Sequence, residues 1–157
     1  MIRFYVDCLE KMLEFCGNHG FYHKDYYALK ELIVDTDPEK IITVLQIKKI
    51  IAHYFGITVA ELVSKNRHKR VRFPRQFAHY YCLLLTEELV SEIGRKVGMQ
   101  GHPNVLNSRK KIRLLAETKY PKDDLKCYLE LEILFTPFII KKRETRDQGV
   151  QQTRMNI

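Results

Sequence analysis

The sequence has little of what a membrane or secreted protein requires. No apolar run approaches the roughly 20 residues of a membrane-spanning helix. The apolar start of the chain carries Asp7 and Glu10, which argues against a signal peptide. The four cysteines show no CxxC spacing, so we expect them to be reduced and mostly buried. These absences predict a cytoplasmic protein without a membrane partner.

Signatures of catalysis and of metal binding are also scarce. No nucleophile elbow or cysteine–histidine signature occurs, and no carboxylates show acid–base or metal-ligand spacing. Cys16, His19 and His23 have a spacing that zinc ligands use, but Cys8 lies about two helical turns before Cys16, unlike the paired thiolates of a zinc knuckle. We therefore expect neither an enzyme nor a bound metal or other cofactor.

Basic residues, by contrast, are in surplus. Lys and Arg outnumber Asp and Glu by 27 to 19, a balance that favours polyanion partners. The surplus is densest between positions 65 and 75, where there is no acidic residue. Six basic residues occupy that segment: Lys65, Arg67, Lys69, Arg70, Arg72 and Arg75.

The spacing of apolar residues predicts an all-α fold. Residues 1–37 are expected to form a helical hairpin that packs on the rest, because so short a segment cannot bury a core of its own. Residues 38–140 are expected to form the main domain as a multi-helix bundle. Residues 141–157 are almost free of apolar side chains and are expected to be a disordered polar tail.

Helix-start signals divide the main domain. Asp37 followed by Pro38 predicts the start of a helix that ends at Gly56. A capping box from Thr58 to Glu61 predicts a short helix ending near Ser64.

A second set of signals follows the basic segment. Residues 65–72 are expected to form a basic loop, and Pro74 to start the next helix. A short helix at 90–97, a glycine-containing turn at 98–101 and a longer helix from His102 give a helix-turn-helix pattern. Three residues of its second helix are expected to face the core: Val105, Ile112 and Leu115. A last helix or extended segment is expected over 123–135.

Three stretches in this order resemble domain IV of the bacterial replication initiator DnaA over roughly residues 41–135. They are Tyr54 to Val63, the Pro-Arg-Gln element at 74–76 with the basic residues before it, and Glu92-Ile-Gly94 leading to Gly98 and His102.

The resemblance implies a Trp-repressor-like helix-turn-helix that binds double-stranded DNA in replication initiation or its regulation. It also implies a recognition helix in the major groove and an arginine, here Arg67, in the adjacent minor groove. The candidate DNA-binding residues are Arg67, Lys69, Arg70, Arg72, Arg75, Gln76, His102, Pro103, Asn104, Asn107 and Arg109.

The sequence departs from the family at the junction before the recognition helix. The family reads Gly-Gly-Arg-Asp-His-Thr-Thr-Val, whereas here Gly101 replaces the acidic residue and Pro103 and Asn104 replace the two threonines. A lysine that the family often carries on the preceding helix is Leu83. These changes predict a target that differs from the usual DnaA box.

The family's ATPase is also missing, since no G-x-x-x-x-G-K-[ST] loop occurs. We therefore expect a stand-alone DNA-binding protein, cytoplasmic and associated with the nucleoid, that does not hydrolyse ATP by itself.

Other interpretations remain open at this point. The run of basic residues is also explained as an ordinary solvated surface, and His102 is also explained as a capping or packing residue. Two alternatives concern the chain as a whole: a transcriptional regulator, and a helical protein-interaction module that has lost base readout. In that last case a replication initiator or another protein would bind through the N-terminal helices.

Overall fold

The computed structural model describes residues 41–98 and 100–155, with side chains described as far as Arg146. All secondary structure in these ranges is helical. The expected hairpin at 1–37 lies outside the described residues. So do Cys8, Cys16, His19 and His23, which were considered above as zinc ligands. No group of His, Cys, Asp and Glu in the described part of the chain is arranged to hold a metal ion. None of the described helices combines the length and apolarity needed to cross a membrane.

Six helices follow one another along the described chain. Their bounds are α3 Val44–Tyr54, α4 Val59–Val63, α5 Lys69–Leu85, α6 Val90–Lys96, α7 His102–Thr118 and α8 Lys122–Met155.

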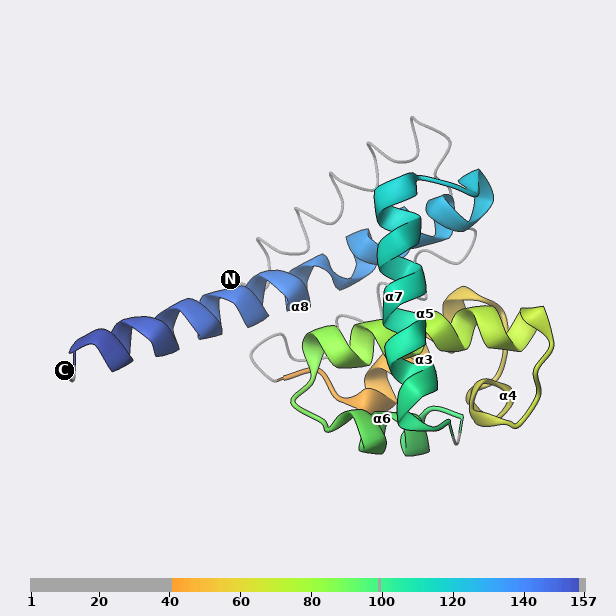
Figure 1. Ribbon diagram of the computed structural model, residues 1–157, viewed down its shortest axis with the longest axis horizontal. Helices are drawn as coiled ribbons and strands as arrows, with labels where there is room; N and C mark the ends of the chain where they lie inside the picture. Colours follow the sequence, from red (N-terminus) through yellow and green to blue (C-terminus); the bar gives the residue numbers. More distant parts are fainter. Residues whose placement is uncertain (1–40, 99, 156–157) are drawn as a thin grey trace.

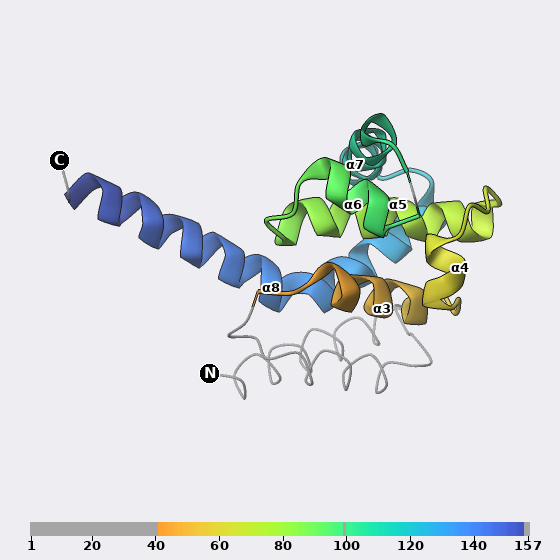
Figure 2. The same ribbon diagram turned by 90° about the horizontal axis from the view of Figure 1, so that it is seen from below.

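Helix α5 is the centre of the bundle. It contacts every other described helix. Helix α7 crosses it on one side (Figure 1), and α3 lies on the opposite side (Figure 2). Because α5 has neighbours on both sides, its apolar residues are among the most completely buried of the described chain. Those with 2 % exposure or less are Phe77, Ala78, Tyr81, Cys82 and Leu85.

Helix α8 is anchored on the bundle by its first half. Phe135 stacks on Tyr81 with ring centroids 4.1 Å apart. Tyr81 also donates a hydrogen bond to Glu132 at 3.1 Å, and Tyr54 donates one to Glu130. These part-buried tyrosine–carboxylate pairs help to fix the register of α8, because each hydroxyl donates to one oxygen of a carboxylate that is costly to bury without a partner.

The start of α3 differs from the sequence expectation. The helix begins at Val44, not at Pro38, and residues 41–43 are not helical. Thr43 is the N-cap: its side chain accepts from the Gln46 backbone N–H at 3.3 Å, and the Gln46 side chain accepts from the Thr43 N–H at 2.8 Å. This capping box was missed, while the one predicted at Thr58 and Glu61 is confirmed.

Helix α5 also begins earlier than expected. It starts at Lys69, so Pro74 lies inside the helix and does not begin it. The backbone N–H groups of Val71 and Arg72 both bond to the His68 carbonyl, at 3.0 and 2.8 Å. Val71 is buried and holds this extra turn against the bundle. The basic loop is therefore short, and Lys69, Arg70 and Arg72 project from the first turn of a helix.

The helix-turn-helix is confirmed with nearly the expected bounds. Helix α6 ends at Lys96, α7 begins at His102, and Val105, Ile112 and Leu115 are buried as predicted. The end of the chain differs. Helix α8 continues through Met155, where a disordered tail from residue 141 was expected. Among the described side chains, those of α8 pack against the apolar core as far as Ile139, and the residues that follow include many good helix formers.

The turn between α6 and α7 depends on Gly94. Its carbonyl accepts a hydrogen bond from the Gln100 N–H at 2.8 Å. A Cβ at this position would overlap the Gln100 carbonyl oxygen and approach a Val105 methyl group to 3.2 Å. The chain therefore reverses direction at a distance from α6 that only glycine permits.

We predict that Gly94→Ala destabilises the fold by about 1–3 kcal/mol, because the added methyl group pushes α7 away from α6. Gly101→Ala is the matched control: its Cβ would meet only the Pro103 ring at 3.7 Å, an ordinary contact. Urea unfolding of both variants measures the difference, and equal stabilities would contradict the close approach.

Candidate nucleic-acid interface

A groove of about 390 Å³ lies between the start of α5 and the first half of α7. Its lining contains four cationic residues and no carboxylate. The lining residues are Arg67, Arg72, Arg75, Gln76, His79, Gln100, Asn104, Asn107, Ser108 and Lys111. The structure thus brings together two segments about 30 residues apart, each of which the sequence had marked separately.

The start of α7 is an open helix end. His102, Pro103 and Asn104 are all exposed, and Gly101, the N-cap, has no side chain to cap the helix. Proline fits here because the first-turn N–H groups have no intrahelical acceptor. Asn107, one turn further, is exposed and also lines the groove. Arg109 is exposed but does not line the groove.

The expected cations are divided between the groove and its margin. Arg67 and Arg72 are exposed and line the groove. Lys69 and Arg70 are exposed at the start of α5 but outside the lining. Gln76 lines the groove one turn after Arg72 and is half-buried.

Arg75 has a different role from the one expected. Only 4 % of its surface is exposed. Its guanidinium group donates to the backbone carbonyls of Leu62 at 2.9 Å, Ser64 at 2.6 Å and Asn66 at 3.1 Å. The expectation that Arg75 lies on the solvent-facing surface as a DNA contact is therefore wrong. The side chain is enclosed because the end of α4 supplies one acceptor within its reach and the α4–α5 loop supplies two.

Gly98 lies directly against the Arg75 side chain. Its φ is +88°, and a Cβ there would overlap the arginine side chain. Arg75 thus links the loop that carries Arg67 to the turn that precedes α7. Burial lowers the pKa of this guanidinium from its usual value, and the three carbonyls compensate for the lost hydration.

A buried histidine ties α7 to α5. His79 is 2 % exposed, its Nε2 lies 2.9 Å from the Val97 carbonyl oxygen, and its Nδ1 lies 3.0 Å from Ser108 Oγ. A carbonyl only accepts, so Nε2 carries the proton of the neutral ring. Burial lowers the pKa of His79 to about 4, which keeps the ring neutral at physiological pH.

Sequence reasoning missed several residues of the groove. Gln100, His79 and Ser108 are in neither the basic segment nor the expected reading face, and no local pattern marks them. Lys111 belongs to a basic stretch of α7 without a distinguishing motif. Helical spacing offered one signal, because Lys111 is one turn after Asn107 and two turns after Asn104 on the same face.

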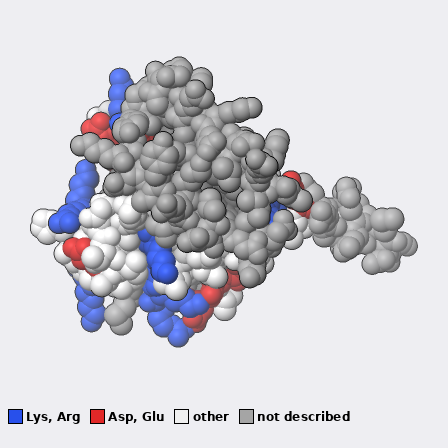
Figure 3. Space-filling view, turned by 180° about the vertical axis from the view of Figure 1, so that it is seen from behind, with Lys and Arg blue, Asp and Glu red and all other residues white. Residues whose placement is uncertain are grey.

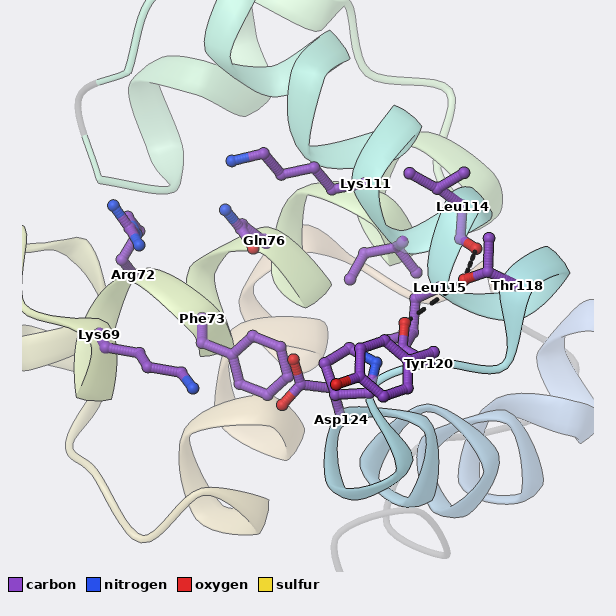
Figure 4. A pocket seen from close by; sticks show the side chains of 12 residues that line it. Lys69, Arg72, Phe73, Gln76, Lys111, Leu114, Leu115, Thr118, Tyr120 and Asp124 are labelled. Carbon is purple, nitrogen blue, oxygen red and sulfur yellow. Dashed lines mark hydrogen bonds between the residues drawn. The ribbon is translucent and has the colours of Figure 1, made fainter.

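A second hollow of about 260 Å³ adjoins the groove. The two share Arg72, Gln76 and Lys111, which gather at one end between α5 and α7 (Figure 4). The other end is more apolar and is formed by Phe73 and Tyr120 with Asp124 nearby (Figure 4). Past Lys111, the α7 residues that line this hollow are uncharged, so along α7 the cationic lining of the groove ends at a residue that the two hollows share.

The visible described residues on the face seen from behind have a different distribution of charge from the groove. On that face Lys and Arg side chains form separate patches among acidic and uncharged ones (Figure 3). The groove, in contrast, has cations without a single carboxylate in its lining.

Comparison with known proteins agrees with this geometry. The family described as "Bacterial dnaA protein helix-turn-helix" matches residues 44–112, which covers α3 to the middle of α7. Residues 44–112 are therefore similar to the helix-turn-helix domain of DnaA. The resemblance read from the Pro-Arg-Gln and Glu-Ile-Gly elements is confirmed.

Three curated relatives are all named chromosomal replication initiator protein DnaA. The chromosomal replication initiator protein DnaA of Geobacter metallireducens is 42% identical over 91 residues, which are 57% of this chain and 20% of the relative. The DnaA proteins of Geobacter sulfurreducens and Buchnera aphidicola are 40% and 39% identical over 88 and 92 residues. Those matches cover 56% and 59% of this chain. The chain spans about a fifth of the length of these relatives.

Three of the positions at which the sequence differs from the family motif lie together in the structure. Gly101, Pro103 and Asn104 form the exposed start of α7, at the mouth of the groove. The fourth position, Leu83, lies on α5 and packs against the apolar core.

The enclosure of Arg75 makes a testable distinction. We predict that Arg75→Met lowers the free energy of unfolding by about 2–5 kcal/mol, because three carbonyls lose a charged donor. Arg67→Ala, on an exposed residue of the same segment, should leave stability within about 0.5 kcal/mol. Denaturant unfolding measures both, and an Arg75→Met variant of normal stability would contradict the internal role.

The buried His79 predicts a pH dependence of stability. The folded-state pKa of about 4 lies below the unfolded value of 6.5. The contribution of the neutral ring is therefore complete above about pH 6.5 and is lost, by about 3 kcal/mol, as the pH falls toward 4. Comparing the pH profiles of wild type and His79→Gln isolates this contribution. Parallel profiles would show that His79 titrates normally.

Proposed function

We propose that this protein binds double-stranded DNA through the groove between α5 and α7. The single observation that carries the proposal is that groove's lining, in which cations and amides from two distant segments meet without a carboxylate. Phosphates attract such a surface, and amides at its floor have the donors and acceptors that base edges require.

The docking that we infer has three parts. The start of α7, with His102, Pro103, Asn104 and Asn107, faces base edges in the major groove, where recognition helices of this type enter. The loop carrying Arg67 reaches the adjacent minor groove, whose negative potential is greatest in A·T-rich sequence. The first turn of α5 lies between them and contacts phosphates through Lys69, Arg70 and Arg72.

The dimensions of the helices support this docking. Helix α7 has 17 residues and is therefore about 25 Å long, enough to lie along a major groove about 12 Å wide. Its first turn has no acidic side chain. Such a helix end tolerates nearby phosphates.

The biological setting follows from the relatives. Their names describe them as chromosomal replication initiators. We infer that this protein acts on the nucleoid in replication initiation or its regulation, by binding and not by catalysis. It either competes for initiator-like sites or marks a site for a partner. Its preferred sequence differs from the DnaA box in the major-groove half, since the family's readout residues are replaced there.

A charge-neutralisation experiment tests the proposal. Replacing Lys69, Arg70 and Arg72 by Gln should weaken binding to all duplexes and reduce the log–log salt slope by about 1 per lost phosphate contact. Fluorescence anisotropy with labelled duplexes at several salt concentrations gives the slope.

The matched control removes the same number of charges elsewhere. Lys49 on α3 and Lys126 and Arg143 on α8 are exposed and lie outside the groove. Their replacement by Gln should leave the slope nearly unchanged. If both triple variants lower the slope equally, binding depends on net charge alone and the groove is not the interface. Failure of the wild type to bind any duplex would overturn the proposed function itself.

A further inference from the structure

Two amide side chains at the start of α7 fix each other's orientation. Gln100 Nε2 donates to the Gly98 carbonyl at 2.9 Å, and Asn104 Nδ2 donates to Gln100 Oε1 at 3.0 Å. A backbone carbonyl only accepts, so Gln100 must turn its NH₂ group toward Gly98 and its oxygen toward Asn104. Asn104 must then present its NH₂ group to Gln100. The Gly98 carbonyl thus excludes the flipped arrangement of both amides.

The backbone of Asn104 is held as firmly as its side chain. Its carbonyl accepts from Ser108 Oγ at 2.8 Å. The same Ser108 hydroxyl lies 3.0 Å from Nδ1 of the buried His79, which belongs to α5. Nδ1 carries no proton when Nε2 does, so the single Ser108 proton is donated to one of these two acceptors at a time. The first turn of α7 is therefore positioned relative to the helix that carries the phosphate-binding cations.

The outer part of the Asn104 amide remains available. A primary amide has two N–H donors, and Gln100 takes one of them. In the described part of the chain no hydrogen bond occupies Oδ1 or the second N–H of Asn104. The residue is exposed and lines the cationic groove. One acceptor and one donor are thus presented side by side at the tip of the helix.

We propose that Asn104, positioned by Gln100, reads an adenine in the major groove. Oδ1 accepts from the adenine N6 amino group, and Nδ2–H donates to adenine N7. This inference rests on the proposed DNA binding and names one base of its target. Guanine is excluded by the same geometry, because its major-groove edge has two acceptors and would place O6 against Oδ1.

Base selection followed by atom replacement tests the assignment. Selection from a random DNA pool with the full chain should return a site with one invariant adenine that becomes variable with Asn104→Ala. Replacing that adenine by 7-deazaadenine removes only the N7 acceptor. This should weaken wild-type binding roughly two- to tenfold, the effect of one hydrogen bond, and should not weaken Asn104→Ala further.

Asn107→Ala is the matched control, because Asn107 lies one turn along α7 in the same groove, whereas the amide that bonds to Gln100 is that of Asn104. It should keep the full 7-deazaadenine penalty at the selected position. Equal penalties in wild type and Asn104→Ala would overturn the assignment.

The positioning role of Gln100 has its own readout. Gln100→Ala should leave the melting temperature and the affinity for random duplex nearly unchanged. Discrimination between adenine and the other bases at the Asn104 position should fall at least severalfold. Unchanged discrimination would show that Gln100 does not orient the amide. If the wild type binds no duplex, the proposed function fails. If it binds selectively without an adenine coupled to Asn104, only this inference fails.

Discussion

The arrangement of the groove depends on one buried cation. The guanidinium group of Arg75 occupies the carbonyls of Leu62, Ser64 and Asn66 and packs against Gly98. Removing such a charge from water is costly unless every donor finds an acceptor, so the loop must adopt the path that supplies them. The same side chain therefore determines the shape of the α4–α5 loop and the position of the turn before α7. Without it, the loop that carries Arg67 would lose its connection to the turn before α7.

A second set of contacts makes the tip of α7 rigid. Gly94 brings the turn close to α6, and His79 with Ser108 ties the helix to α5. Rigid placement matters for recognition because a preorganised side chain loses little entropy when it meets its partner. Gly101, Pro103 and Asn104 are carried on this rigid framework and are exposed. Substitutions at these three positions therefore change the surface at the tip of α7 and leave the buried contacts below it in place.

Local sequence features were predictable and long-range ones were not. The capping box at Thr58 and the apolar stripe of α7 follow from spacing alone, and both are confirmed. Pro74 was misplaced because proline favours the first turn of a helix, whereas burial of Val71 draws the helix start further upstream. The burial of Arg75 could not be predicted, because its hydrogen-bond acceptors are backbone carbonyls, and every residue type has one. The same holds for Gln100, whose partners are brought to it only by the turn.

Pro74 divides α5 into parts of unequal local stability. It has no N–H, so the ladder of hydrogen bonds along the helix lacks one bond between the first turn and the remainder. The remainder is held by the bundle core on both sides, while the first turn is held mainly by Val71 and the bonds to His68. Segments with few buried contacts open without unfolding the whole. The first turn can thus move without unfolding the bundle, and amide hydrogens at residues 69–73 should exchange well before those of the core part of the same helix.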